Sequence, residues 1–122
     1  MIFYYCKGCN QVIYKLISED KLLTCCGHKM EELKSNIEPN LRDEHLPVIR
    51  KTGNFVTVTV GNKHPMLDIH RISFIMIETN QGNMYKDTEH LEDAKASFIL
   101  ANQEEIVNIY VYCSVHRLWS LY

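Results

Sequence analysis

Apolar and polar residues alternate along much of the chain from Leu41 onward, which is the period of a half-buried β-strand. The clearest case is 55–60, where valine alternates with threonine. Residues 105–113 form another candidate strand, whose apolar face should carry the Cys113 sulfur inward. That face comprises Val107, Ile109, Val111 and Cys113. Other strands are expected at 46–49, 69–79, 84–85, 97–101 and 118–119, with turns at 52–54 and 80–83. About seven short strands at this spacing predict an antiparallel two-sheet sandwich.

The N-terminal part has a different pattern. Strands expected at 1–5 and 11–17 flank Cys6-Lys-Gly-Cys9, and a turn at 18–21 leads back to Cys25-Cys26-Gly27. A polar segment at 31–39 predicts a linker. A unit of about 36 residues buries too little apolar surface to fold alone, so a structural metal is expected. Four thiolates suit tetrahedral zinc or iron, and a purely structural zinc site is an open alternative. We therefore expect two domains, 1–36 and 37–122.

Composition narrows the classes of function. The net charge of -2, without a basic run interleaved with aromatic residues, argues against nucleic-acid binding. The N-terminus lacks the pattern of a signal peptide, and no apolar run approaches the ~18 residues of a membrane span, so a soluble cytoplasmic protein is expected. Five cysteines in a reducing compartment favour metal ligation or redox chemistry over disulfides.

The sandwich segment carries a second set of possible metal ligands. Any one of them has an ordinary explanation, such as a polar loop histidine or a small buried cysteine. Together, imidazole and thiolate favour iron, zinc or copper, and five protein ligands fit a coordination shell with one open position. The set comprises His45, His64, His70, Cys113 and His116. His28 and His90 lie outside it and are expected to be exposed.

These motifs resemble those of the desulfoferrodoxins, the two-centre kind of superoxide reductase, over nearly the whole chain. Cys6-x-x-Cys9 followed by the adjacent pair Cys25-Cys26 resembles desulforedoxin. The rest resembles the neelaredoxin-type domain through three motifs in order: Glu44-His45-Leu-Pro47, His64-Pro-Met-x-x-x-His70 and Cys113-x-x-His116-x-Leu-Trp119.

The resemblance implies an all-β protein, with a small metal-stapled β unit followed by an immunoglobulin-like sandwich. It implies two irons. The first, held by Cys6, Cys9, Cys25 and Cys26, would be a one-electron centre. The second would lie among His45, His64, His70 and His116, with Cys113 as the axial thiolate and superoxide at the sixth position. The implied reaction adds one electron and two protons to superoxide and yields hydrogen peroxide, with a rubredoxin-type protein as electron donor. Family members are commonly dimers.

The chain departs from the family beside the second centre. Asp43 and Glu44 stand where the family usually has glutamate, which caps the oxidised iron, and lysine, which lies near the open site. The sign of the second charge is therefore reversed, unless Arg42, Lys51 or Lys63 supplies the missing cation. Arg117 replaces a usual glycine. Two other functions stay open: an iron electron carrier or redox sensor that reacts slowly with superoxide, and a structural zinc module on a binding sandwich.

Overall fold

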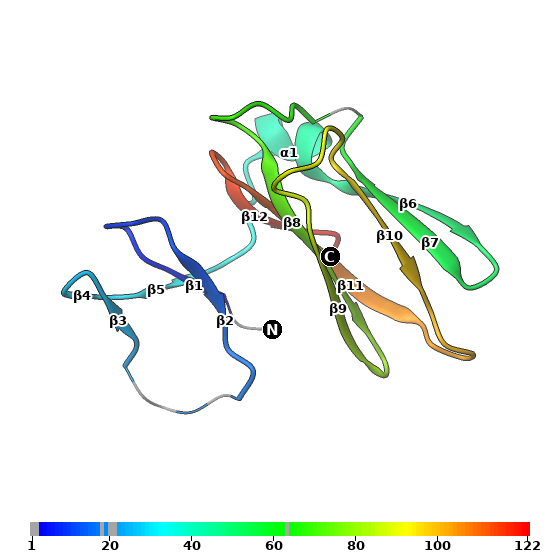
Figure 1. Ribbon diagram of the computed structural model, residues 1–122, viewed down its shortest axis with the longest axis horizontal. Helices are drawn as coiled ribbons and strands as arrows, with labels where there is room; N and C mark the ends of the chain where they lie inside the picture. Colours follow the sequence, from blue (N-terminus) through cyan, green and yellow to red (C-terminus); the bar gives the residue numbers. More distant parts are fainter. Residues whose placement is uncertain (1–2, 18, 20–21, 63) are drawn as a thin grey trace. The chain divides into compact units, whose positions relative to one another are not determined.

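The computed structural model describes residues 3–17, 19, 22–62 and 64–122. The chain divides into two compact units, Met1–Lys34 and Ser35–Tyr122. The elements of both are labelled in Figure 1. Among the described residues, no helix is long and apolar enough to cross a membrane.

The N-terminal unit is built from very short antiparallel strands. A three-stranded sheet has the order β2-β1-β5, formed by Val12–Tyr14, Phe3–Tyr5 and Glu31–Leu33. A two-stranded ribbon joins β3 (Thr24–Cys25) to β4 (His28–Lys29). The buried apolar residues of this unit, within its described part, are Phe3, Cys6, Met30 and Leu33. Such a core is too small to offset the chain entropy of folding.

The expectation of a linker over 31–39 is wrong at its start. Glu31–Leu33 is strand β5, in which Leu33 pairs with Phe3 and is buried while both glutamates are exposed. An edge strand with one apolar residue shows too little alternation to be recognised from sequence. The strand expected over 11–17 is limited to Val12–Tyr14. Residues 1–2 of the first expected strand and residues 18, 20 and 21 of the expected turn lie outside the described residues.

The second unit is an antiparallel sandwich, which confirms the predicted fold class. Three strands form one sheet in the order β10-β7-β6: Lys95–Ile99, Phe55–Val60 and Pro47–Thr52. Four form the other in the order β12-β11-β8-β9: Arg117–Ser120, Ile106–Cys113, Ile72–Thr79 and Gly82–Asp87. Apolar side chains of both sheets pack into one core cluster, so the two sheets face each other.

Strand β11 follows the predicted alternation only in its second half. Ile109, Val111 and Cys113 are fully buried, as expected, but Val107 is 50% exposed. The pairing with β8 shifts register between Ile106 and Asn108, and this irregularity turns Val107 away from the core. Ile106 packs against the core in place of Val107, and the regular inward alternation that carries Cys113 to the interior runs from Ile109.

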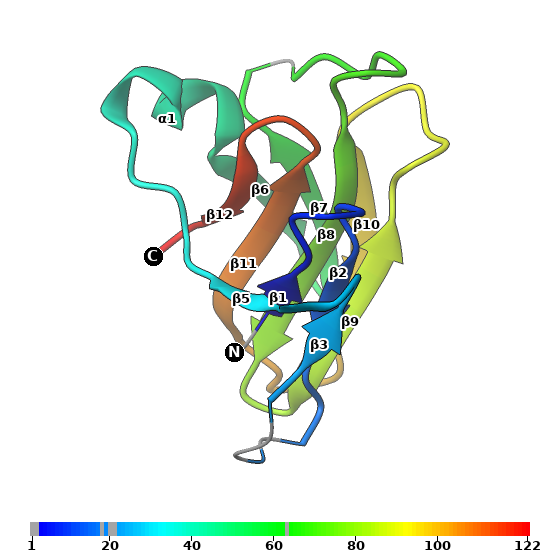
Figure 2. The same ribbon diagram turned by 90° about the vertical axis from the view of Figure 1, so that its left-hand side faces the viewer.

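A short helix, α1 (Pro39–His45), stands where the sequence pattern predicted β structure from Leu41. Proline occupies the first helical turn, and the Glu38 side chain accepts a hydrogen bond from the Asn40 amide at 3.3 Å. A helix this short produces no clear helical period, so the sequence pattern does not reveal it. Figure 2 shows α1 at the same end of the sheets as the loop before β8 and the β11–β12 hairpin.

Gly61 sets how closely β7 approaches this helix. Its φ is +61°, and a Cβ built there would lie 2.3 Å from the Glu44 carbonyl oxygen. Its amide donates to the Leu46 carbonyl at 2.8 Å. Any side chain at 61 would therefore force the end of α1, and with it His45, away from the sandwich.

Gly61→Ala is expected to lower the free energy of unfolding by more than the roughly 1–2 kcal/mol that a left-handed backbone alone costs. Gly53→Ala is the matched control, because Gly53 has φ +59° and no atom of the described residues lies within 4 Å of the added Cβ. Urea unfolding of both variants gives the comparison. Equal losses in the two would show that contact with α1 is unimportant.

Candidate metal centres

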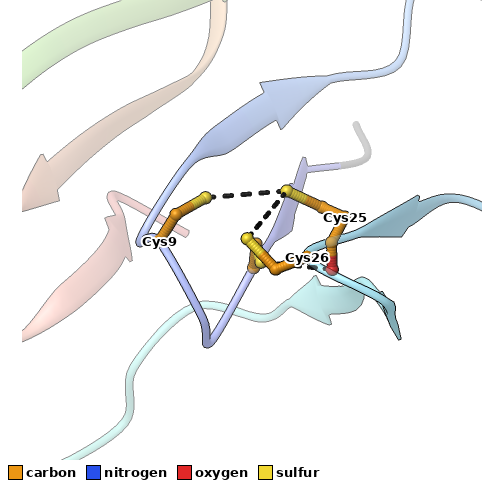
Figure 3. Close-up of side chains that lie close together, drawn as sticks. Cys9, Cys25 and Cys26 are labelled. Atoms are coloured by element: carbon orange, nitrogen blue, oxygen red, sulfur yellow. Dashed lines mark hydrogen bonds between the residues drawn. The ribbon is translucent and has the colours of Figure 1, made fainter.

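The four cysteines of the N-terminal unit converge on one point. Cys6 and Cys9 lie on either side of the turn after β1, while Cys25 ends β3 and Cys26 follows it. Their sulfur atoms all lie within 4.8 Å of one another. The Cys25 sulfur is 3.6 Å from that of Cys9 and 3.9 Å from that of Cys26, as drawn in Figure 3.

The backbone around these cysteines allows the close approach. A Cβ on Gly8 would lie 2.9 Å from the Cys26 Cβ, so only glycine fits between the two ligand pairs. Cys26 itself has φ +52°, a left-handed conformation that lets two adjacent cysteines direct their sulfurs to the same side. The Asn10 amide closes the first turn by donating to the Cys6 carbonyl at 2.8 Å.

Crowding separates the pKa values of the thiols. Burial alone would raise the pKa of Cys6, but hydrogen bonds from the Cys9 amide, the Cys25 thiol and the Gly8 amide bring it down to about 7. The thiols of Cys6 and Cys9 raise the pKa of Cys25 to about 12, and they also raise that of Cys26. Four thiolates cannot coexist at this distance without a cation, so the donor set fits a tetrahedral metal.

A second group of donors lies at one end of the sandwich. His45 is the last residue of α1, His64 lies in the loop after β7, His70 precedes β8 and Cys113 ends β11. Their ligand atoms all lie within 4.8 Å of one another. The two sheets and the helix each contribute, so the predicted convergence of loop histidines with a cysteine at a strand end is found.

His116 completes a closed ring of four imidazoles. Its ring centroid lies 4.9 Å from that of His45 and 5.1 Å from that of His70. His64 closes the other side, at 4.7 Å from His45 and 4.9 Å from His70. We call these four side chains the histidine ring. The Nδ1 atom of His116 is 3.8 Å from the Cys113 sulfur.

Backbone carbonyls fix the orientation of two imidazoles. The Nδ1 atom of His45 lies 2.7 Å from the Leu41 carbonyl oxygen, and that of His64 lies 2.8 Å from the Pro65 carbonyl oxygen. Since a carbonyl only accepts, each Nδ1 carries the proton and each Nε2 presents a lone pair. Burial lowers the pKa of His45, and it lowers that of His64 to about 4, so both rings are neutral at pH 7.

These lone pairs face one another. The Nε2 atoms of His45 and His64 are 3.1 Å apart. The Nε2 atom of His70 is also buried and has no hydrogen-bond partner among the described residues. Buried acceptors that face each other without a donor are costly, and a cation at their centre removes that cost. The arrangement therefore fits a metal ion bound by imidazole nitrogen.

Cys113 supplies the soft donor of this centre. The residue is fully buried, and burial raises the pKa of its thiol, although hydrogen bonds from the His116 and Val115 amides lower it. The His116 amide donates to the sulfur at 3.4 Å. A metal ion is the partner that would hold this thiol as thiolate in an apolar site.

Several neighbours hold the ring in place. The Trp119 ring stacks on His45 with centroids 4.6 Å apart and an interplanar angle of 9°. The Asn36 side-chain amide donates to the His116 carbonyl at 3.0 Å. The sequence motif that begins at Cys113 includes Trp119, but sequence reasoning missed Asn36 and the Leu41 carbonyl. Leu41 precedes His45 by one helical turn, a signal that requires the helix to be recognised first.

The acidic pair lies beside the ring in sequence. Asp43 and Glu44 are both exposed in the last turn of α1. As successive residues of a helix, their side chains point about 100° apart. Arg42 and Lys51 are exposed, while Lys63 lies outside the described residues. His28 and His90 are exposed, and neither belongs to a donor cluster in the described part of the chain.

Comparison with known proteins gives one consistent result. Residues 37–122 match the family described as desulfoferrodoxin. Desulfoferrodoxin of Syntrophotalea carbinolica is 33% identical over 121 residues, covering 96% of this chain and 92% of that protein. That of Nitratidesulfovibrio vulgaris is 32% identical over 118 residues, with coverage of 96% and 92%.

A solved structure has a similar fold. The superoxide reductase from Treponema pallidum aligns with a TM-score of 0.80, covering 98% of this chain and 94% of its own. The two sequences are 21% identical, so this similarity concerns the fold alone.

Proposed function

This chain belongs to the desulfoferrodoxin family, and we therefore propose that it is a superoxide reductase that converts superoxide to hydrogen peroxide. The observation that carries this proposal is the histidine ring beside the buried Cys113 thiol. The two donor sets, four cysteines and the histidine–cysteine cluster, are typical of a two-iron desulfoferrodoxin.

The proposed metal ligands form two sets, one for each iron. Cys6, Cys9, Cys25 and Cys26 would hold one iron, and His45, His64, His70, His116 and Cys113 would hold the other. Iron in the second site would supply a redox electron and an open coordination position for superoxide. One electron and two protons added to superoxide give hydrogen peroxide, which balances the reaction.

The protein's own groups have defined tasks in this proposal. The carbonyls of Leu41 and Pro65 hold the tautomers of His45 and His64, so that each Nε2 faces the metal. Burial of Cys113 keeps water from its sulfur, and the His116 amide tempers the donor strength of the thiolate. Asp43 and Glu44 are proposed to act at the open side, where Asp43 would cap the oxidised metal and Glu44 would set the local charge.

The four-cysteine unit is proposed as a one-electron centre that receives electrons from a rubredoxin-type donor. A homodimer and a cytoplasmic location belong to the same proposal. They follow from the family resemblance and from the reducing conditions that free thiols require.

The test combines metal content with stoichiometry. Iron at both sites should give a red iron–tetrathiolate chromophore and, after oxidation, a separate blue thiolate-to-iron band. In stopped-flow experiments with superoxide, reduced protein should form one peroxide for each superoxide consumed, whereas dismutation would form half as much. Zinc at both sites would instead support the alternative of a structural zinc module on a binding sandwich.

A second candidate function is an iron electron carrier or redox sensor with weak superoxide reactivity. It is favoured by the negative charge of Glu44, which lies exposed in the last turn of α1, one residue before His45. Superoxide is an anion, and capture of small anions is faster under a positive potential.

Glu44→Lys is expected to speed the reaction with superoxide several-fold. Reversing a unit charge ~7 Å from the open position changes the interaction by about 1 kcal/mol even in a water-like dielectric. The wild-type rate should stay flat or rise with added salt, because screening weakens repulsion, while the variant's rate should fall.

Glu105→Lys is the matched control for this prediction. Glu105 is exposed, and its carbonyl accepts from Asn80 beyond the far end of β8. This substitution makes the same change in net charge at the opposite end of the strand. A wild-type rate that already falls steeply with salt would show that another cation attracts the substrate.

A further inference from the structure

Arg71 connects three loops at the metal end of the sandwich. Its guanidinium donates through Nη2 to the Leu91 carbonyl at 2.7 Å and through Nη1 to the Met66 carbonyl at 3.4 Å. Its backbone amide donates to the Ser114 hydroxyl at 3.0 Å, and its carbonyl accepts from the Ser114 amide at 2.9 Å. One residue thus links the loop before β8, the loop before β10 and the β11–β12 hairpin.

Two of these loops carry the proposed ligands. Met66 lies between His64 and His70, and Ser114 lies between Cys113 and His116. The Met66 side chain adds a further link, because its sulfur accepts the Ile72 amide at 3.3 Å. Movement of either loop would therefore displace a pair of donors.

The third loop supplies a fixed anchor. The Leu91 amide donates to the Thr88 carbonyl at 3.1 Å. Thr88 is fully buried, and its hydroxyl donates to the Ile72 carbonyl at 2.7 Å. Its amide donates to the Ser73 carbonyl at 3.0 Å. The Leu91 carbonyl is thereby tied to β8, so the Arg71 guanidinium is held against the rigid sheet.

Only arginine can make both side-chain links. A guanidinium presents five donors in a rigid planar fork, and here Nη1 and Nη2 bind different carbonyls, whereas lysine has one nitrogen on a flexible stem and cannot reproduce two fixed nitrogen positions. The Nε atom of Arg71 is buried and has no partner among the described residues. Because an unmet buried donor opposes folding, replacing Arg71 by an apolar side chain of similar length removes a cost as well as two hydrogen bonds.

We propose that Arg71 is a positioning residue that holds the ligand-bearing loops at the spacing the metal requires. Its side chain ties the loop of His64 and His70 to the anchored Leu91 carbonyl, and its backbone, fixed by that side chain, ties the β11–β12 hairpin to the same point. The inference rests on the metal-binding role proposed above for the histidine ring and Cys113. It predicts a loss of metal affinity that exceeds any loss of fold stability. Groups behind metal ligands typically contribute about 10- to 100-fold in affinity.

The experiment compares Arg71→Met, Arg71→Lys and wild type with Co²⁺ as the probe. The Cys113-dependent charge-transfer band is obtained by subtracting the spectrum of Cys113→Ser, which removes the contribution of the four-cysteine unit. Arg71→Met should weaken Co²⁺ binding at this site about 10- to 100-fold and leave the spectrum of the four-cysteine unit unchanged. Arg50→Met, which replaces an exposed arginine on β6, should bind Co²⁺ as the wild type does.

A second readout needs no metal. In metal-free protein, hydrogen exchange at the Ser114 amide should be faster in Arg71→Met than in wild type, while the core of β8 and β11 stays equally protected. Arg71→Lys should resemble Arg71→Met in both measurements, because lysine keeps the charge but loses one link.

Two results would overturn the inference while leaving the proposed function intact. One is wild-type Co²⁺ affinity in Arg71→Met with a lowered Tm, which would make the residue merely structural. The other is full recovery in Arg71→Lys, which would show that charge matters and bridging does not. A wild type without any Cys113-dependent band would overturn the proposed metal centre itself, and this inference with it.

Discussion

Cys113→Ser is expected to abolish both the blue thiolate-to-iron band and peroxide production, while sparing the red chromophore of the four-cysteine unit. A serine hydroxyl does not ionise near neutral pH, so the anionic soft donor of the ring is lost. The four imidazoles stay close together, because Trp119 stacking and the carbonyl of Leu41 do not depend on the sulfur. The variant should still bind the metal through its histidines, but the bound metal would lack the thiolate ligand and its charge-transfer band.

The loss of activity should exceed the roughly 10- to 100-fold that removing a group behind a ligand costs. Stopped-flow kinetics with superoxide and the visible spectrum of the oxidised protein provide the two measurements. His90→Ala is the control, since His90 is exposed and outside the described donor clusters. An unchanged blue band in Cys113→Ser would remove Cys113 from the site.

Cys25→Ser is expected to unfold the N-terminal unit and leave the sandwich folded. Binding of a structural metal by a small thiolate site contributes about 10–16 kcal/mol, most of which serves as folding free energy. The unit has little else to replace it, because its strands are two or three residues long and few of its described apolar residues are buried. Cys25 is also the thiol with sulfur contacts to both Cys9 and Cys26.

Hydrogen exchange resolved by residue is the measurement. Amides of β1, β2 and β5 should lose protection, whereas those of β8 and β11 keep it, since the sandwich has its own apolar core. Thr24→Ser, at an exposed neighbouring position on the same ribbon, is the matched control. If residues 1–36 of Cys25→Ser stayed as protected as in wild type, the dependence of this unit on metal would be refuted.

The sequence predicted the sandwich well because its strands alternate. In β7 the residues Val56, Val58 and Val60 are fully buried between half-buried threonines, as the pattern indicates. The pattern failed where local geometry breaks the period. Val107 is turned outward by an irregular pairing, and β5 presents a single buried leucine in an otherwise charged segment.

The candidate ligands were predictable because their chemistry is rare and their motifs are short. What surrounds them was not. The Leu41 carbonyl contacts His45 only because a helix forms there, and Asn36 contacts the His116 carbonyl across 80 residues of sequence. Arg71 follows His70 without any signal, since its role depends on two backbone carbonyls that any residue would provide.

The residues of the histidine ring come from both sheets, and this affects how the chain reaches its native state. His64 follows a strand of one sheet, while His70 and Cys113 border strands of the other. The full set of donors therefore exists only after the sheets have docked, so we expect the ion to bind late, after the main folding barrier. Interactions absent from a transition state slow unfolding and leave the folding rate nearly unchanged. We therefore expect the bound metal to slow unfolding of the sandwich, and so to lengthen the lifetime of the native state, without speeding its formation.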